Sequence, residues 1–371
     1  MRDVSELGDF GLSWLEGSGP HADVVLSTRV RLARNLQGHP FSPRMQDDER
    51  RRILDSVQTA ARQGSLLRDG VSLDVSALVP LSRQVLLERH LVSRELVGEG
   101  GRETRAGAGL IIGPEELVGV MVNEEDHLRL QGLMSGLRLR EAYAAVDVLD
   151  EELGRELPMA FHHEFGFLTS CPTNVGTGLR ASILIHLPGL VLTKEIGRVL
   201  QGIGQVGLTF RGLYGEGSEV VGNFFQISNQ TTLGKPEEDL IDHLHKIVQQ
   251  VIQYETHARG VLMREAPAVI EDKIWRAYGL LRYARSISFQ EVMNLLSGVR
   301  LGVSMKLLSG LSVYTLNKIM IYAQPAHLEQ AAGRPLSEAE SDVHRAAYVR
   351  RILGGEGELP DTSGDDGSEV E

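Results

Sequence analysis

Cysteine is almost absent from the sequence, since Cys171 is the only one. A disulfide framework is therefore excluded, and this cysteine content is typical of cytoplasmic proteins. Long apolar runs are absent too, because none reaches the roughly 18 residues that a membrane-spanning helix needs. The first 20 residues contain four acids and no apolar segment typical of a signal peptide. We therefore expect a cytoplasmic protein with no membrane role.

Lysine is scarce as well: the sequence has six lysines and 32 arginines, and the first lysine is Lys194. No Gly-Lys-Ser/Thr tripeptide is present, which excludes a Walker A loop. The His-Arg-Asp catalytic loop of ordinary protein kinases is also missing. Any cationic contact from the first 193 residues must therefore come from arginine or histidine. A compositional bias toward arginine is the simpler explanation for the chain as a whole.

The overall composition is that of an ordinary globular protein, with 42% hydrophobic and 24% charged residues. The formal net charge of −12 argues against direct binding of nucleic acid. Part of this charge lies in residues 354–371, which hold seven acids and no base. That composition predicts a disordered, solvated tail.

The hydrophobic pattern changes near residue 258, where we place a domain boundary. Before it, short apolar runs predict strands that alternate with helices; after it, nearly every periodic segment is helical. We expect an α+β fold in which helices flank a mostly antiparallel sheet, followed by a smaller all-helical domain. The predicted parts are an N-terminal segment (1–23), an α+β domain (24–258), a helical domain (259–353) and the acidic tail (354–371).

Several helix boundaries are predicted from single residues. Pro188 is expected to open a helix that runs to about residue 200, because proline fits the first helical turn. Pro236 is expected to open a longer helix that Gly260 ends. Ser288, with a glutamate three residues later, has the spacing of a capping box.

Polar residues interrupt the predicted strand over Ser27–Asn35. Arg29 and Arg31 are two apart, so their side chains point to the same face of the strand. Two guanidinium groups on one face repel each other unless an anion lies between them, and their forked geometry suits a phosphate. The stretch predicts a phosphate site; an exposed edge with solvated arginines is the alternative.

Three consecutive acids, Glu124, Glu125 and Asp126, follow another predicted strand. A solvated loop is the commoner meaning of such a run. Here His127 and Arg129 lie close by in sequence, and the apolar strand would hold the acids rigidly. The run is therefore a candidate site.

Two loops are rich in glycine. Cys171–Gly178 leads into a strand that begins at Arg180, although such a loop is often only structural and a lone cysteine is usually a small buried side chain. The second loop, Arg211–Glu219, begins with an arginine, and mobile loops of this kind often close over substrates.

These stretches together resemble the signatures of the phosphagen kinases, the creatine and arginine kinases, over about residues 24–258. Phosphagen kinases carry a helical domain ahead of the first motif, where this chain has about 20 residues, and they lack the helical region after 258. Both departures resemble the bacterial protein arginine kinases of the McsB type. The first of them, the missing helical domain ahead of the first motif, implies a site open to arginine on a protein surface. The matching segments are Ser27–Arg31, Asn123–Arg129, Cys171–Arg180, Arg211–Glu219 and Gly222–Gly234.

The resemblance implies an ATP-dependent kinase that phosphorylates arginine residues in other proteins, with Mg²⁺ bridging the phosphates. It implies that Glu125 is the base, that Glu216 is a second carboxylate on the guanidinium, and that Cys171 lies beside the substrate. It also implies that ATP is bound by Ser27, Thr28, Arg29, Val30, Arg31, His90, Arg129, Arg180, Ala181, Ser182, Ile183, Leu184, Arg211, Gly212, Leu213, Tyr214 and Gly215.

Partners follow from the resemblance alone. They are protein substrates with exposed arginine, a zinc-binding activator protein, a heat-shock repressor and a Clp ATPase, in a stress-response role; a homo-oligomer is also compatible. One alternative is a kinase for free arginine or another small guanidino compound. Another is a non-catalytic adaptor for a protease, although Glu125, Glu216 and five arginines argue against adaptor work alone.

Protein arginine kinases of this type also carry Arg-Asp-x-x-Arg-Ala near the C-terminus, an allosteric pocket for phosphoarginine. Here Ser341 replaces the first arginine. Asp342 and Arg345 are three apart, so they share one face of a predicted helix. A surface helix with an ordinary ion pair is the alternative. The matching residues are Ser341, Asp342, Val343, His344, Arg345 and Ala346.

Overall fold

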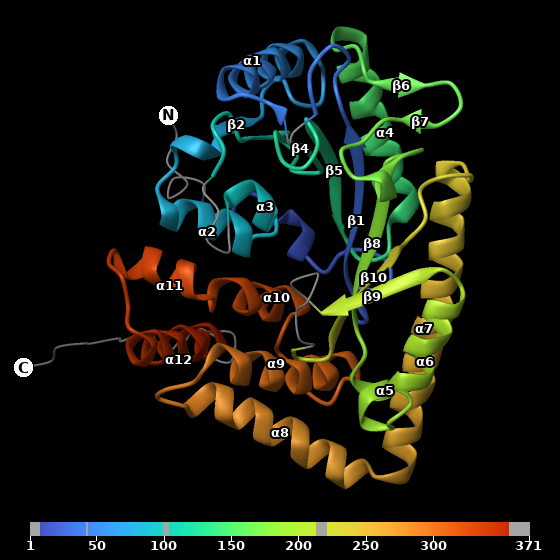
Figure 1. The fold of residues 1–371 in the computed structure, drawn as a ribbon. Helices are drawn as coiled ribbons and strands as arrows, with labels where there is room; N and C mark the ends of the chain where they lie inside the picture. The colour runs from blue at the N-terminus through green and yellow to red at the C-terminus, as the bar shows by residue number, and fades with distance from the viewer. Residues whose placement is uncertain (1–7, 42–43, 99–103, 213–220, 356–371) are drawn as a thin grey trace, which may run out of the picture.

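The computed structural model describes residues 8–41, 44–98, 104–212 and 221–355. Figure 1 shows a twisted sheet with a group of helices packed below it. Most of the predicted tail (354–371) and most of the loop Arg211–Glu219 lie outside the described residues. Within the described ranges, no helix has both the length and the apolar character needed to cross a membrane.

Eight described strands form one sheet, and all of their pairings are antiparallel. This confirms the predicted α+β class with an antiparallel sheet. A separate small hairpin pairs β6 (Phe161–His162) with β7 (Gly166–Phe167). The strand order of the large sheet is β2 (Val71–Asp74), β3 (Gly109–Ile112), β4 (Val118–Val122), β5 (Leu128–Ser135), β1 (Val25–Arg34), β8 (Leu179–His186), β10 (Phe224–Asn229), β9 (Leu208–Gly212).

One face of the sheet is apolar, because alternate residues of each strand point to it. On β1 these include Val30 and Leu32, both of which are buried in the largest core. Helices with apolar stripes cover this face. They are α1 (Asp47–Gln63), α4 (Leu139–Glu156) and α7 (Glu237–Glu265).

The opposite face is covered by elements from three parts of the chain. Trp14 and Leu15 of the 3-10 helix η2 (Ser13–Leu15) pack in a second core with Leu133 and Leu184 of the sheet. A third core joins β2 and β3 to α2 (Pro80–Glu88) and α3 (Arg94–Val97). The helical region completes the second core with α8 (Pro267–Tyr283), α9 (Phe289–Ser304), α10 (Val313–Tyr322), α11 (Pro325–Ala332) and α12 (Glu338–Gly355).

The prediction of one continuous helix from Pro188 to about residue 200 was wrong. The segment forms two helices, α5 (Pro188–Leu192) and α6 (Ile196–Gln205). Lys194 lies between them with φ +63°, a left-handed conformation that a continuous right-handed helix cannot contain.

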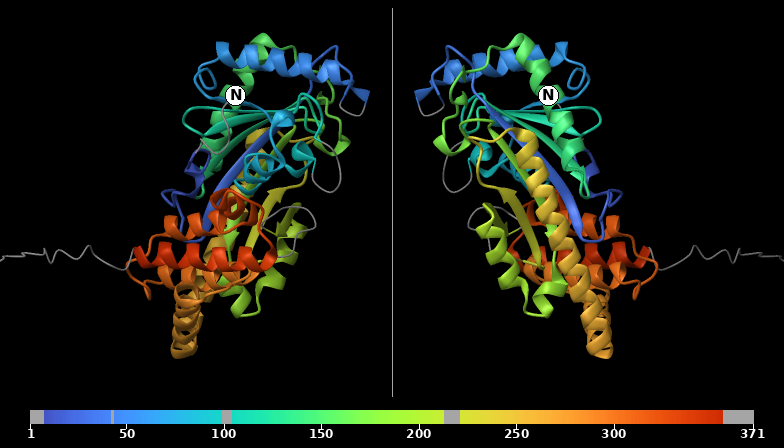
Figure 2. Two further views of the ribbon diagram at one scale, coloured as in Figure 1. Left: turned by 90° about the vertical axis from the view of Figure 1, so that its left-hand side faces the viewer. Right: turned by 90° about the vertical axis from the view of Figure 1, so that its right-hand side faces the viewer.

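The predicted end of the long helix was also wrong. Gly260 lies inside α7, which continues to Glu265 because Leu262 and Met263 pack against the second core. Figure 2 shows α7 running along the sheet and on into the helical region. Ser288 does cap α9 as predicted, because its Oγ accepts a hydrogen bond from the Glu291 amide at 3.2 Å.

Candidate active site

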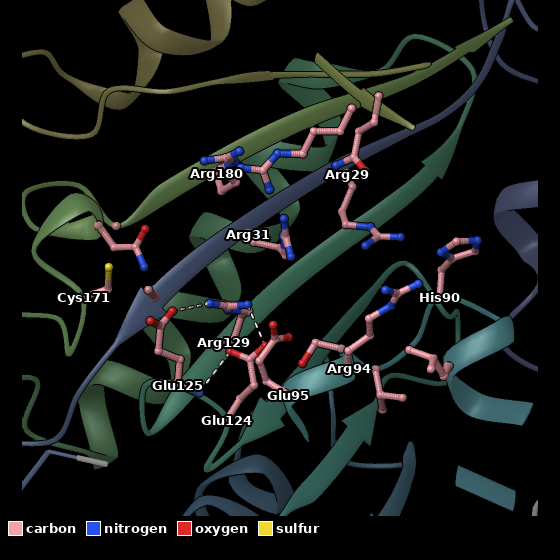
Figure 3. Close-up of a pocket in the computed structure, with 18 of the residues that line it drawn as sticks. Arg29, Arg31, His90, Arg94, Glu95, Glu124, Glu125, Arg129, Cys171 and Arg180 are labelled. Atoms are coloured by element: carbon pink, nitrogen blue, oxygen red, sulfur yellow. Dashed lines mark hydrogen bonds and ion pairs between the residues drawn. The ribbon is translucent and has the colours of Figure 1, made fainter. Parts of the chain in front are cut away.

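A cavity of about 630 Å³ lies on the polar face of the sheet. In Figure 3, Cys171 and Glu125 lie at one end, His90 lies at the other, and arginines lie between them. The cavity is bounded by sheet strands, by α2 and α3, by the loop before β8 and by one residue of the helical region. Its charged and polar lining includes Arg29, Arg31, Gln84, Glu88, His90, Ser93, Arg94, Glu95, Glu124, Glu125, Arg129, Cys171, Thr173, Asn174, Arg180, Arg211, Gln226 and Gln324.

Strand register gathers the arginines at this site. Arg31 on β1 lies directly across from Arg180 on β8, and Ala33 on the same strand lies across from Arg129 on β5. Arg211 on β9 lines the cavity from further along the sheet. Like charges placed opposite each other destabilise a sheet, so the arrangement has a cost unless an anion is bound.

The pKa values of these arginines also show that their positive charges are unfavourable in the folded protein. Burial lowers the pKa of Arg29 to about 10. Burial also lowers the pKa of Arg31 well below its ordinary value, and the charges of Arg129, Arg29 and Arg180 add to this. The Arg31 Nε atom is buried without a hydrogen-bond partner among the described residues. The cluster is therefore suited to an oxyanion with several oxygen atoms, such as a nucleotide phosphate chain.

The acidic run forms the tight turn between β4 and β5. Asn123 adopts φ +58°, which asparagine tolerates, and its backbone N–H donates to the His127 backbone carbonyl at 2.8 Å. Asn35 at the end of β1 holds this turn: its Nδ2 donates to Asp126 Oδ1 at 2.7 Å, and its Oδ1 accepts from the His127 amide at 2.9 Å. Asp126 and His127 are fully buried, so both serve to shape the turn.

Glu124 and Glu125 have different environments although they are neighbours. The Glu124 side chain is fully buried and accepts from Arg129 Nη1 at 2.6 Å. The Glu125 side chain is 42% exposed and lies 3.4 Å from Arg129 Nη2. Burial raises the pKa of Glu125; Arg129 opposes this, while Asp126, Glu124 and Glu95 add to it. Of the two, Glu125 is the one placed to exchange a proton with a bound molecule.

The loop before β8 carries Cys171 to the cavity wall. Its Sγ lies 3.0 Å from Thr173 Oγ1. Gly178 has φ +65°, and a Cβ there would lie 2.6 Å from the Ala33 carbonyl oxygen, so glycine lets the loop approach β1 closely. The Thr232 hydroxyl holds the loop in place, because its Oγ1 lies 2.8 Å from the Thr173 carbonyl oxygen and 2.9 Å from that of Val175.

His90 lies between α2 and α3 with φ +59°. Burial lowers its pKa to about 3, with a further contribution from Arg29, so the ring is neutral at pH 7. Trp14 packs against it edge to face, with ring centroids 5.6 Å apart. His90 thus offers the cavity a neutral aromatic surface.

The predicted ATP-binding residues fall into two groups, according to which face of the sheet their side chains point to. Arg29, Arg31, His90, Arg129, Arg180 and Arg211 line the cavity, and Ser27, Ser182 and Leu184 line a small adjoining pocket. The side chains of Val30, Ala181 and Ile183 lie in the core beneath, and Thr28 Oγ1 donates to the Gly136 carbonyl at 2.6 Å. Gly212 ends β9, while Leu213, Tyr214, Gly215 and Glu216 lie outside the described residues.

Several lining residues were missed from the sequence. Arg94 and Glu95 belong to the first turn of α3, which Ser93 caps through the Leu96 amide at 3.2 Å. The serine followed by Arg-Glu was a signal for this short helix. Gln226 and Gln324 had no local signal, because Gln226 lies on β10, whose other face is apolar, and Gln324 lies between α10 and α11.

The predicted phosphoarginine motif lies at the start of α12. Arg345 is buried: its Nε donates to the Ala323 carbonyl at 2.8 Å, its Nη1 donates to the Ile287 carbonyl at 3.0 Å, and it pairs with Asp342. Ser341 is buried as well, whereas Val343 is exposed. His344 is exposed and Ala346 belongs to the second core.

Comparison with known proteins identifies the family of the domain that holds this cavity. Residues 52–258 match the model of the ATP:guanido phosphotransferase C-terminal catalytic domain. The solved structure of lombricine kinase has the same fold, with TM-score 0.55 and 23% identity over 65% of this chain and 68% of that one. The duplicated taurocyamine kinase from Schistosoma mansoni aligns with TM-score 0.57 and 25% identity, over 79% of this chain and 40% of that one. The fold is thus that of these kinases, and the chain belongs to the ATP:guanido phosphotransferases.

The rest of the chain narrows the family. Residues 267–363 match the model of the protein-arginine kinase McsB C-terminal domain. A protein-arginine kinase of Moorella thermoacetica is 46% identical over 345 residues, which is 92% of this chain and 97% of that protein. One from Bacillus cereus (strain G9842) is 46% identical over 343 residues, 92% and 95% of the two chains. The chain belongs to the protein-arginine kinases.

Proposed function

We propose that this protein transfers the γ-phosphoryl group of ATP to the guanidinium group of arginine residues in other proteins. The main support for this proposal is that the half-exposed carboxylate of Glu125 lines the same cavity as a cluster of buried arginines. Family membership supports ATP as donor and protein arginine as acceptor.

The acceptor nitrogen must lose a proton during the reaction. A guanidinium pKa of roughly 12.5–13.8 makes this nitrogen a poor nucleophile at neutral pH. In our proposal Glu125 accepts the proton as the N–P bond forms and the bond between the γ-phosphorus and the bridging oxygen of ADP breaks. Burial already raises the pKa of Glu125, which makes it a better proton acceptor than a solvated glutamate.

The remaining groups hold the reactants. Arg29, Arg31 and Arg180 hold the phosphates, and their charge offsets the negative charge of the transferring group. Arg129 positions Glu125, to which it lies close, while its other nitrogen is committed to Glu124. We also propose that Cys171 contacts the arginine side chain, since it lies at the same end of the cavity as Glu125 (Figure 3).

Mg²⁺ would enter with the nucleotide. Among the described residues, no group of three or more histidine, cysteine, aspartate or glutamate side chains could hold a metal ion. Nucleotide phosphates usually supply most of the ligands of this ion, so the residues present are compatible with it. When bound, the ion neutralises phosphate charge.

The test uses ATP, Mg²⁺ and an arginine-rich protein, with free arginine as the competing acceptor. We expect an acid-labile phosphate on nitrogen in the protein, detected by mass spectrometry under neutral conditions. Phosphorylation of free arginine alone would support the small-molecule alternative. Absence of any phosphorylated product with a folded, ATP-binding sample would support the adaptor alternative.

Partners and regulation remain proposals. We propose a cytoplasmic stress-response role with a zinc-binding activator protein, a heat-shock repressor and a Clp ATPase as partners. We also propose phosphoarginine as the ligand of Asp342, whose side chain is 25% exposed beside the buried Arg345. Pull-down from a lysate with and without ATP would test the partners.

A further inference from the structure

One residue of the cavity lining comes from the helical region, which lies far from the sheet in sequence. Gln324, between α10 and α11, lines the cavity and is 4% exposed. Its Nε2 donates to the backbone carbonyl of Glu88 at 3.3 Å. A residue more than 230 positions beyond α2 therefore borders the same space as the arginine cluster.

Glu88 fastens this wall to α2. Its carboxylate accepts from the Ala326 amide at 2.9 Å and from the His327 amide at 3.1 Å, and lies 2.7 Å from His327 Nδ1. A negative charge at a helix N-terminus is stabilised by the helix dipole and by the unpaired amides there. We call Glu88, His327 and their three contacts the α11 clasp.

A second side chain sets the orientation of the clasp. Arg89 is buried, and its Nε donates to His327 Nε2 at 3.3 Å. Because Nε2 accepts, the proton of the neutral ring lies on Nδ1, which donates to Glu88. The other Arg89 nitrogens donate to the carbonyls of Phe10 and Gly8, at 2.8 and 2.7 Å. Each hydrogen bond of the clasp therefore has a defined donor and acceptor. Together they hold the start of α11, and with it Gln324, against α2.

The chemistry of the cavity assigns Gln324 to one end. Carboxylates and Cys171 occupy the far end, and arginines occupy the middle. His90 follows α2 directly, so Gln84 and Leu87 of α2 line this end, and Gln324 joins them through the Glu88 carbonyl; Arg94 also lies beside His90 in Figure 3. The neutral ring of His90, the apolar side chains and the amides at this end suit a planar heteroaromatic ring.

We propose that Gln324 recognises the nucleobase of the bound nucleotide, and that the α11 clasp positions it; this rests on the proposed function. Adenine and guanine present opposite donor and acceptor patterns on the edge that carries the exocyclic group. A freely rotating amide would match either base. The Glu88 carbonyl can only accept, so it holds Nε2 in place and keeps the amide in one orientation. The helical region thereby contributes to nucleotide selectivity.

The main test compares Gln324→Ala with the wild type. We expect the KM for ATP to rise roughly tenfold, the size of one good side-chain contact to a base, with kcat within about twofold. The ratio of kcat/KM for ATP to that for GTP should fall. Gln330→Ala is the matched control, because this glutamine lies on α11 close to Gln324 in sequence but does not line the cavity. Unchanged KM and unchanged ATP/GTP selectivity in Gln324→Ala would overturn the proposal.

The clasp is tested by His327→Ala and His327→Asn. Alanine should lower ATP/GTP selectivity in the same direction as Gln324→Ala, and asparagine, which keeps a donor near the Nδ1 position, should restore part of it. If Gln324→Ala does not fold, Gln324→Asn retains a buried amide and shortens it by one methylene; wild-type selectivity there would contradict the proposal.

Direct calorimetric titration of ATP and of GTP separates this proposal from the proposed function. Preference for ATP that is lost in Gln324→Ala supports base recognition even if no arginine is phosphorylated. Equal affinity of the wild type for ATP and GTP rejects base recognition even if arginine kinase activity is present.

Discussion

The charged side chains of the cavity and those of the packed interior differ in their neighbours. On β1, Arg31 faces Arg180 across the sheet, and burial lowers the pKa of both Arg29 and Arg31. Arg34 on the same strand is also buried, yet its Nη2 lies 2.6 Å from Asp150 and its Nη1 donates to two carbonyls. Arg29 and Arg31 are therefore suited to binding an anionic ligand, whereas the charge of Arg34 is already paired within the protein.

The same contrast separates other charged residues. Glu125 is half-exposed at the cavity, while Glu124 beside it is buried against Arg129. Arg345 in the helical region resembles Arg34, since carbonyls and Asp342 surround it. Residue type and motif position therefore do not decide whether a charge binds a ligand or holds the fold; the local partners do.

The largest expected effect is at Glu125. Glu125→Gln keeps the shape and removes the basicity, so kcat should fall by about 10²–10⁴-fold, with ATP affinity retained. Steady-state kinetics and ATP titration measure this. Glu164→Gln, at an exposed glutamate away from the cavity, is the control. Wild-type kcat in Glu125→Gln would mean that this carboxylate is not the base.

The arginine contrast is tested by Arg31→Met against Arg34→Met. We expect Arg31→Met to lower kcat/KM for ATP by about 10²–10³-fold, as for loss of one donor to the transition state. Without nucleotide it should raise the melting temperature, because the folded-state pKa of Arg31 is depressed and its charge therefore destabilises the fold. Arg31→Lys should restore activity only in part, since lysine is a point charge.

Arg34→Met should do the reverse. Its loss leaves Asp150 unpaired, so the free energy of unfolding should fall by about 3–5 kcal/mol, with little change in KM for ATP. Denaturant titration measures the first quantity. If both variants changed stability in the same direction, the distinction between the two arginines would be wrong.

The regulatory motif gives a smaller effect. Asp342→Ala should abolish binding of phosphoarginine to the full chain in calorimetry, with arginine kinase activity in the absence of phosphoarginine unchanged. Arg345→Ala should instead lower the free energy of unfolding by about 1–3 kcal/mol for each buried carbonyl left without a donor. No heat from the wild type at millimolar phosphoarginine would mean that the motif serves the fold alone here.

The smallest effect concerns pH. Activity requires ionised Glu125, whose pKa is raised mainly by burial, so the acidic limb of kcat/KM should lie above the ordinary glutamate value of 4.5. Glu95→Gln removes a nearby negative charge and should move this limb to lower pH. A limb that moves upward, or that persists in Glu125→Gln, would assign it to another group.

Much of the site could be predicted because its residues belong to continuous motifs. Alternation along a strand places Arg29 and Arg31 on one face whatever packs around them, and the turn Asn123–His127 follows directly from its strand. Their individual roles remain predictions. Glu216 lies outside the described residues.

Other features depend on tertiary contacts that no local pattern contains. The difference between Glu124 and Glu125 arises from the buried pair with Arg129. Gln324 reaches the cavity only because the α11 clasp fastens two distant segments. The continuation of α7 past Gly260 likewise reflects packing that overrides helix propensity.

The long helix α7 has a consequence for folding. Its 29 residues span about 44 Å, and they cross position 258 without a break. Leu244 and Val248 belong to the core under the sheet, while Leu262 and Met263 pack on the core of the helical region. Over residues 237–265, all of which the structure describes, the helix joins the two cores without a flexible linker, so melting one core removes the support of the other. Unfolding should therefore be a single cooperative transition, and separating the two parts at residue 258 would cut through a helix that both cores share.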